Sequence, residues 1–293
     1  MKWEGQERSD PVEDRRGDGQ APRRGVGGRG IGLGTIAIAL VAGWIFGINP
    51  LTVLGLLGGG EGPVLQQQSP AGPARKPPAE DRAAAFVSVV LRDTELVWGK
   101  VFQAAGSTYQ APRLVLFRGT IPTACGTGES AMGPFYCPGD TKVYIDLDFF
   151  DTLSGKLGAP GDFAQAYVVA HEVGHHVQNL MGITGKVDAM RARQSPVQAN
   201  ATSVQVELQA DCLAGVWAFH SQQGKGWLER GDIEEAMNAA TQIGDDTLQQ
   251  KARGRVVRDS FTHGSSEQRV RWFQRGLQSG NAGQCNTMKA REL

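Results

Sequence analysis

The segment from Ala166 to Leu180 carries the pattern that most constrains the fold of this chain. It reads AYVVAHEVGHHVQNL, with apolar residues on both sides of a His-Glu-Val-Gly-His core. On an α-helix, residues four apart lie on one face, so His171 and His175 would stack one turn apart. Glu172 would lie about 100° round the helix from His171. We therefore predict a helix over 162–181 that presents two imidazoles together.

A second pair of polar residues falls on another predicted helix, over 201–220. Its sequence VELQADCLAG places Glu207 and Asp211 four residues apart, hence on one helical face. The two carboxylates could be solvated acids on an exposed face. However, apolar neighbours such as Val206 and Leu208 favour a buried environment, in which carboxylates need partners.

Together these side chains have the composition of a catalytic zinc site, which combines three protein ligands with one open position. We predict one zinc ion per chain, with His171, His175 and Glu207 as its ligands. Asp211 would accept the outer N–H of a ligand, and His171 is the candidate. Glu172 is not a ligand in this arrangement, but it could reach a water molecule at the open position and act as general base.

The remaining patterns predict a few strands followed by packed helices. Residues 79–105 carry apolar side chains at helical spacing, and 114–117 is a short apolar run typical of a strand. Residues 142–150 (KVYIDLDFF) alternate as a strand with one face on the core would. Further helices are predicted over 232–243 and 265–277. This order is typical of an α+β domain with a small sheet.

An uncharged segment near the N-terminus is long enough to cross a bilayer. It runs from 31 to 57 and begins with IGLGTIAIALVAGWIFGI. Arginines cluster before it, whereas no Lys or Arg follows until Arg75, which predicts a cytoplasmic N-terminus and an outer domain. A cleaved signal peptide is the alternative, although its apolar core is normally only about 7–15 residues long.

The segments on either side of this span differ from the rest of the chain in composition. Residues 1–30 are polar, charged and rich in Gly, which predicts a disordered cytoplasmic tail. Residues 58–78 are rich in Gly, Pro and Gln, as a flexible linker is. The folded domain is therefore expected over 79–293, in the periplasm or outside the cell.

The chain has four cysteines and no CxxC pair, so an all-cysteine zinc site is not expected. An even number in a domain outside the cytoplasm favours disulfides over four buried thiols. Cys125 and Cys137 flank a Gly-rich loop and are predicted to pair. Cys212 would then pair with Cys285 and tie a helix to the C-terminal tail.

Overall charge argues against a polyanionic partner. The chain has 30 basic and 30 acidic side chains, hence no formal net charge, and no basic stripe interleaved with aromatic residues. We therefore predict no nucleic-acid partner. His176, five residues after His171, should point away from the metal and serve as a surface or supporting residue.

Several stretches resemble known zinc peptidases. The combination of HEVGHH and ELQAD is similar to the HExxH…ExxxD signature of gluzincins, which include thermolysin and the membrane-anchored heat-shock and prenyl-protein endopeptidases. More closely, the chain resembles the bacterial neutral zinc metallopeptidase family. The stretches that carry this resemblance are MKWEGQERSDPVEDRRG, GPFYCPGDTKVYIDLDFF, AYVVAHEVGHHVQN, VELQADCLAGVWA and FTHGSSEQRVRWF.

The resemblance implies a zincin-like fold and a membrane-anchored peptidase that hydrolyses peptide bonds. It also implies an edge strand over 136–148 that pairs with an extended substrate, so Tyr136, Val143 and Tyr144 are its candidate residues. The Thr-His-Gly-Ser stretch around His263 resembles one whose His stabilises the oxyanion, although a structural His near a helix start would look the same.

A second class of function also fits a zinc site at the cell surface. A non-catalytic scaffold or binding protein could hold the same metal without cleaving anything. Such a protein would have no use for a base beside the metal, and the presence of Glu172 therefore favours a peptidase with a peptide or protein substrate.

Overall fold

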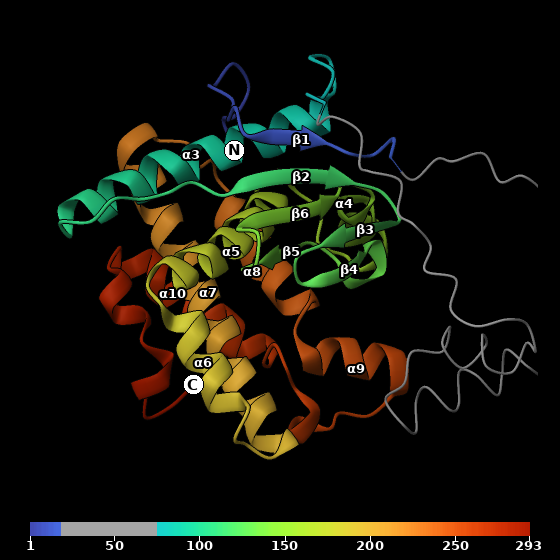
Figure 1. Ribbon diagram of the computed structural model, residues 1–293, viewed down its shortest axis with the longest axis vertical. Coiled ribbons are helices and arrows are strands. Elements are labelled where there is room, and N and C mark those ends of the chain that lie inside the picture. The colour runs from blue at the N-terminus through green and yellow to red at the C-terminus, as the bar shows by residue number, and fades with distance from the viewer. Residues whose placement is uncertain (19–74) are drawn as a thin grey trace, which may run out of the picture. The chain divides into compact units, whose positions relative to one another are not determined.

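The structure is a computed structural model that describes residues 1–18 and 75–293. Figure 1 shows its elements from blue at the N-terminus to red at the C-terminus. The strands of the described residues are β1 Val12–Asp14, β2 Arg113–Phe117, β3 Thr120–Thr123, β4 Gly126–Glu129, β5 Phe135–Cys137 and β6 Lys142–Asp146. The α-helices are α3 Arg82–Ala104, α4 Asp148–Asp151, α5 Asp162–Leu180, α6 Ile183–Arg191, α7 Pro196–Lys225, α8 Asp232–Gln242, α9 Asp245–Arg253 and α10 Ser266–Ser279. Short turns of helix are η1 Ser130–Met132, η2 Thr152–Lys156, η3 Arg258–Ser260, η4 Ala282–Cys285 and η5 Thr287–Lys289.

The main sheet has four strands in the order β1-β2-β6-β5. β1 and β6 run parallel to β2, whereas β5 runs antiparallel to β6 and forms one edge. β3 and β4 form a separate antiparallel pair. The strand predicted over 142–150 ends earlier, at Asp146, because the Asp146 carboxylate accepts the backbone N–H of Asp148 and the chain turns into α4. The fold class is mixed α and β with small sheets, as predicted.

Both faces of the sheet are covered. Val143 and Ile145 of β6 lie in the main core with residues of α3 and α5. Tyr144, between them, lies in a second cluster with Val115 of β2 and Ile121 of β3. The expected polar face of β6 is therefore buried as well, because Ile121 of β3 and Phe135 of β5 pack in the same cluster as Tyr144.

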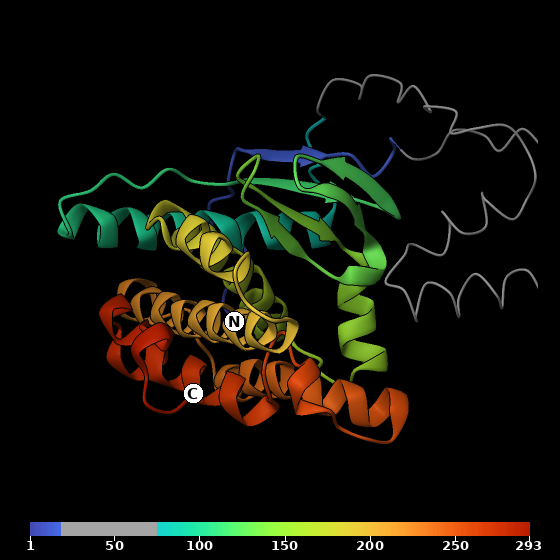
Figure 2. The ribbon, with the colours of Figure 1, turned by 60° about the horizontal axis from the view of Figure 1, so that its bottom comes forward.

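The helices gather on one side of the sheet, as Figure 2 shows. α5 is almost entirely buried, and it packs against α3, α7 and α8. α7 begins earlier than predicted because Ser195 caps it and exchanges reciprocal hydrogen bonds with Gln198, while Pro196 occupies its first turn. The helices predicted over 79–105, 162–181, 232–243 and 265–277 are confirmed within three residues at each end.

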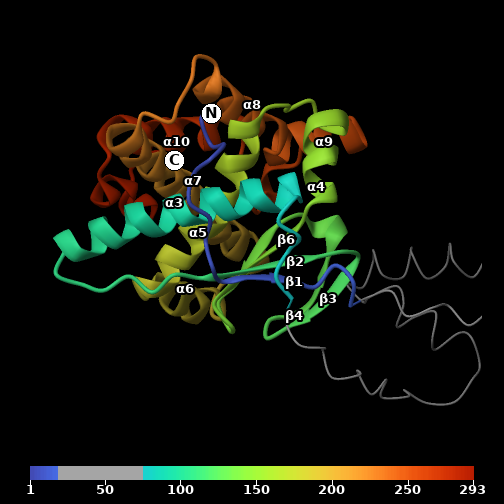
Figure 3. The same cartoon turned by 90° about the horizontal axis from the view of Figure 1, so that it is seen from above.

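Residues 1–18 are part of the folded domain, as Figure 3 shows for the blue segment that crosses α3 and joins the sheet. β1 pairs with β2, and the backbone N–H of Ser9 donates to Ser88 of α3 at 3.0 Å. The backbone N–H of Asp14 donates to the carbonyl of Arg75 at 2.7 Å. The prediction of a disordered tail over 1–30 is therefore wrong for residues 1–18. Polar composition misled it, because strand pairing and ion pairs, rather than an apolar run, hold this segment.

The predicted membrane span at 31–57 lies outside the described residues, and so does most of the predicted linker at 58–78. Within 1–18 and 75–293, no helix combines the length and the apolar character that a bilayer crossing requires. The predicted start of the domain at residue 79 is close to the start of α3 at Arg82, but the folded unit also includes residues 1–18.

Candidate metal centre

Helices α5 and α7 bring the predicted ligands together. The Nε2 atoms of His171 and His175 lie 3.1 and 3.5 Å from the same carboxylate oxygen of Glu207. One donor atom from each residue fits in a group whose members are all within 4.8 Å of one another. α5 supplies two of the candidate ligands because they are four residues apart, and α7 supplies the third because it packs along α5.

Asp211 determines how His171 faces this group. The Nδ1–H of His171 donates to Asp211 at 2.8 Å, which leaves Nε2 directed at Glu207. Asp211 is fully buried and also accepts hydrogen bonds from the hydroxyl of Tyr167 and from Arg269. The predicted role of Asp211 as the support of His171 agrees with this geometry.

Gln178 orients His175 as Asp211 orients His171, through a contact with Nδ1. Its Nδ1 lies 2.9 Å from Oε1 of Gln178, one helical turn further along α5. Both histidines therefore point Nε2 into the group and Nδ1 away from it. Two imidazole nitrogens and one carboxylate oxygen form the donor set of catalytic zinc sites, so the residues present fit this metal.

The charged forms of His171, Glu207 and Asp211 stabilise one another. Burial opposes ionisation of Glu207, but the two histidines outweigh it and hold its pKa well below the usual range. Burial likewise opposes the charge of His171, yet Asp211 and Glu207 raise its pKa to about 10. Burial also disfavours the Asp211 carboxylate, and Arg269 with His171 nevertheless lowers its pKa to about 2. A divalent cation would replace the proton on the Nε2 of His171.

Glu172 lies beside the ligands without joining them. It is buried, with 7% of its surface exposed, and it lines the same cavity as His171 and His175. Burial raises its pKa above 4.5, and the histidines only partly oppose that effect. A carboxylate with raised proton affinity is suited to take a proton near neutral pH.

The group opens into a cavity of about 960 Å³. Its walls come from the loop before β5, from β5, from α6 and α7, and from the loop that carries His263. Met132 and Phe149 line it together with Tyr136. A cavity of this size lies within the range of ligand-binding pockets, about 300–1,000 Å³.

The three residues predicted to pair with substrate lie on two different strands. Tyr136 lies on β5, the edge strand, and lines the cavity. Val143 and Tyr144 lie on β6, whose backbone already pairs with β2 on one side and β5 on the other. Their assignment to substrate pairing is therefore wrong, because an interior strand has no free edge.

His176 of α5 connects this helix to the edge strand β5 through a hydrogen bond with Tyr136. It is buried, and its Nε2–H donates to the carbonyl of Gln110 at 2.6 Å, so its Nδ1 accepts from the hydroxyl of Tyr136 at 3.0 Å. Asn179, the penultimate residue of α5, donates to the same hydroxyl at 3.0 Å. His176 was predicted to lie on the surface or to support a metal ligand, but it is buried and its hydrogen bonds go to Tyr136 and Gln110.

His263 reaches the cavity from the loop between α9 and α10. One carboxylate oxygen of Asp245 accepts backbone N–H bonds from residues 262, 263 and 264 at 2.7, 2.7 and 3.0 Å, which fixes the loop. The Nδ1 of His263 lies 3.4 Å from the other oxygen, and this carboxylate raises the pKa of His263. The side chain is half exposed and lines the cavity wall, and its oxyanion role stays a prediction.

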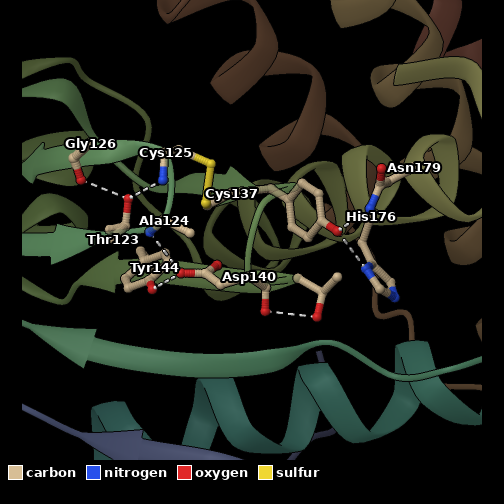
Figure 4. The surroundings of a disulfide bond; sticks show 11 residues. Thr123, Ala124, Cys125, Gly126, Cys137, Asp140, Tyr144, His176 and Asn179 are labelled. Carbon is tan, nitrogen blue, oxygen red and sulfur yellow. Dashed lines mark hydrogen bonds between the residues drawn. A yellow bond between two sulfur atoms is a disulfide. The ribbon is translucent and has the colours of Figure 1, made fainter. Parts of the chain in front are cut away.

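Both predicted disulfides are present. Cys125 pairs with Cys137, and Cys212 pairs with Cys285. Figure 4 shows the first of them at the end of β5, beside the Asp140 carboxylate that accepts hydrogen bonds from Tyr144 and from the backbone of Ala124. The second lies directly after Asp211 on α7.

Sequence reasoning missed the buried partners of the ligands. Gln178, Tyr167 and Arg269 each contact a ligand or its supporting residue. Helical spacing could have found the first two, because Gln178 is three residues after His175 and Tyr167 is four residues before His171. Arg269 comes from a distant helix, and no local pattern indicates its position.

The comparisons agree with this chemistry. The model of a family described as "Putative neutral zinc metallopeptidase" matches residues 1–288. The chain belongs to this family. It is 53% identical over 293 residues to "Uncharacterized protein YpfJ" of Escherichia coli (strain K12), covering 98% of both chains. It is 45% identical over 195 residues to "Uncharacterized protein Rv2575" of Mycobacterium tuberculosis (strain ATCC 25618 / H37Rv), which covers 63% of this chain and 65% of the relative. No solved structure matches the chain.

The family model also matches residues that lie outside the candidate metal centre. The matched range includes residues 1–18, which form β1 and pack on α3. This agrees with the fold, in which that segment is an integral part of the domain.

Proposed function

We propose that this protein is a membrane-attached zinc endopeptidase that hydrolyses peptide bonds. The observation that carries the proposal is the convergence of His171, His175 and Glu207 beside the buried carboxylate of Glu172. Three protein ligands leave a position open for substrate, as catalytic zinc sites require and structural sites do not.

The chain's own residues divide the work of hydrolysis. When bound, zinc supplies Lewis acidity and lowers the pKa of water toward neutrality. Glu172 accepts the proton of the attacking water and passes it to the leaving amine. His263, which also lines the cavity, donates a hydrogen bond to the oxyanion. Tyr136 and its neighbours on β5 bind the substrate backbone by strand addition, because β5 is an edge of the sheet.

A non-catalytic zinc-bound scaffold remains the competing function. It would tolerate replacement of Glu172, whereas a peptidase would not. Burial of the Glu172 carboxylate costs stability, and a role as general base would account for that cost, which supports catalysis.

For localisation, we propose attachment to the cell membrane through residues 31–57, with the domain outside the cytoplasm. The uncharged, apolar composition of that segment and the two disulfides support this proposal. The expected single crossing with a cytoplasmic N-terminus does not fit the fold, because residues 1–18 and 75–293 form one unit. We therefore propose that both flanks of the segment lie on the same side of the membrane.

The test is the Glu172→Gln variant of the full chain. It should bind zinc one to one, as wild type does, and cleave a casein-type substrate at least about 100-fold more slowly. His171→Ala should lose the metal by elemental analysis, and Glu267→Gln, an exposed acid on α10, should behave as wild type. Wild-type cleavage by Glu172→Gln would overturn the mechanism, and a zinc-loaded wild type without peptidase activity would favour the scaffold.

A further inference from the structure

A continuous chain of amide hydrogen bonds connects the metal ligand His175 to the C-terminal tail. His175 contacts Gln178, Gln178 donates to Gln209 of α7, and Gln209 donates to the carbonyl of Cys285. The three contacts measure 2.9, 3.0 and 2.8 Å. Gln178 and Gln209 are both buried, so each polar atom of their amides needs a partner within the protein.

A backbone carbonyl fixes the orientation of the first amide. The Nε2 of Gln178 lies 2.7 Å from the carbonyl oxygen of Val206, which can only accept. The amide nitrogen must therefore face Val206, and the amide oxygen must face His175. An amide oxygen only accepts, so the Nδ1 of His175 must carry a proton. Its Nε2, the atom directed at Glu207, is then the one left to bind a metal.

A second backbone carbonyl fixes the next amide in the same way. The Nε2 of Gln209 donates to the carbonyl of Cys285, which leaves Oε1 to accept from Gln178. Every donor in the chain thus faces an acceptor, and a flip of either amide would set two acceptors against each other. The backbone carbonyls of Val206 and Cys285 therefore fix the donor-to-acceptor direction of every hydrogen bond in the chain.

The position of the Cys285 carbonyl depends on covalent attachment. Cys285 ends the short helix η4 and is joined by its disulfide to Cys212 of α7, three residues after Gln209. The hydroxyl of Thr287 donates to the carbonyl of Gln205 at 2.6 Å and holds the next residues of the tail to the same helix. Without the disulfide, the tail retains only such non-covalent contacts.

We propose that Gln178 is the positioning residue of the ligand His175, and that Gln209 and the Cys212–Cys285 disulfide hold it in register, so that the C-terminal tail supports zinc affinity. The proposal rests on the proposed function, since it concerns the same site. Supporting partners of metal ligands typically contribute about 10- to 100-fold in metal affinity. Links further from the ligand contribute less, because Val206 still orients Gln178 when Gln209 is lost.

The experiment measures zinc affinity by competition with a chromogenic chelator, using the full chain. Gln178→Leu should weaken zinc binding about 10- to 100-fold. Gln209→Leu and the double variant Cys212→Ser/Cys285→Ser should each weaken it about threefold to tenfold. The matched control is Cys125→Ser/Cys137→Ser, which removes the other disulfide, outside the amide chain, and should change affinity less than twofold. The visible spectrum of the cobalt-substituted protein should change in Gln178→Leu while the far-ultraviolet circular dichroism is retained.

A wild-type dissociation constant and cobalt spectrum in a folded Gln178→Leu protein would overturn the proposal. If that variant does not fold, Gln209→Leu decides: a loss of threefold or more supports the chain, and an unchanged constant overturns it. These measurements are independent of catalysis. A wild-type protein that binds zinc but cleaves no peptide would overturn the proposed function alone.

Discussion

Arg269 holds Asp211 through two hydrogen bonds, from Nε to Oδ2 at 2.9 Å and from Nη2 to Oδ1 at 3.0 Å. Both side chains are buried. Because Asp211 also accepts from His171, this pair connects α10 to the candidate metal ligands. The negative charge that orients His171 is therefore compensated from a segment 58 residues away along the chain.

We predict that Arg269→Met destabilises the protein strongly. The variant leaves the Asp211 carboxylate buried without its cation, and breaking a buried pair in this way typically costs about 3–5 kcal/mol. The free energy of unfolding in urea measures the effect. Arg271→Met on the same helix removes an exposed arginine that pairs with Glu267 and Glu292, and should cost at most about 1 kcal/mol. Equal losses in the two variants would contradict the role assigned to burial.

The sequence was sufficient to predict which polar side chains share a helical face, because that spacing is local. Four-residue steps place His171 beside His175 and Glu207 beside Asp211. The approach of Glu207 to the two histidines depends on the packing of α7 on α5, and their role as metal ligands stays a prediction. The partner of Asp211 depends on how α10 crosses α7, and no spacing within one helix encodes that crossing.

The fold was predictable where apolar periodicity is strong, and less so elsewhere. The long helices follow the period of 3.6 residues, and β2 follows a short apolar run. β1 has only three residues, Val12–Asp14, and two of them are acidic. Its stability comes from pairing with β2 and from cations on β2 and β6, which are non-local contacts that composition cannot indicate.

The crossing of α7 and α10 depends on glycine, and this gives a second prediction. A Cβ added at Gly215 would lie 2.1 Å from the carbonyl oxygen of Phe273 and 2.7 Å from the backbone nitrogen of Leu277. Neither backbone atom can move without separating the helices. We expect Gly215→Ala to cost about 1–3 kcal/mol or more, measured as a lower melting temperature.

Gly224, near the end of the same helix, is the matched control. A Cβ there would meet nothing within 4 Å. Because alanine favours helix more than glycine, Gly224→Ala should raise stability by up to about 1 kcal/mol. If both substitutions stabilised the protein, close approach of the helix backbones would not be the reason for Gly215.

The ion pairs of Glu13 predict a dependence of stability on pH. Burial opposes ionisation of Glu13, but Lys142 and Arg113 outweigh it and lower its pKa below 4.5. A lowered pKa in the folded state means that the stabilisation is complete above about pH 4.5 and is lost as pH falls through the lowered value. Glu13→Gln should therefore be less stable than wild type at pH 6. The difference in unfolding free energy should shrink toward zero in acid, and a difference that stayed constant with pH would contradict this assignment.

Contact between residues 1–18 and the rest of the domain predicts the membrane topology. The backbone hydrogen bond from Asp14 to Arg75 joins one residue before the predicted span to one residue after it. A single crossing would place Gln6 and Gln223, both exposed, in different compartments. We instead expect cysteines introduced singly at these two positions to react alike with a membrane-impermeant maleimide applied to spheroplasts. Because the native cysteines are paired in disulfides, they should not react.

Permeabilised cells provide the control in which both positions must be labelled. Labelling of Gln223→Cys without Gln6→Cys in intact spheroplasts would show that the two flanks are separated by the membrane, and the docking of β1 on β2 would then be wrong.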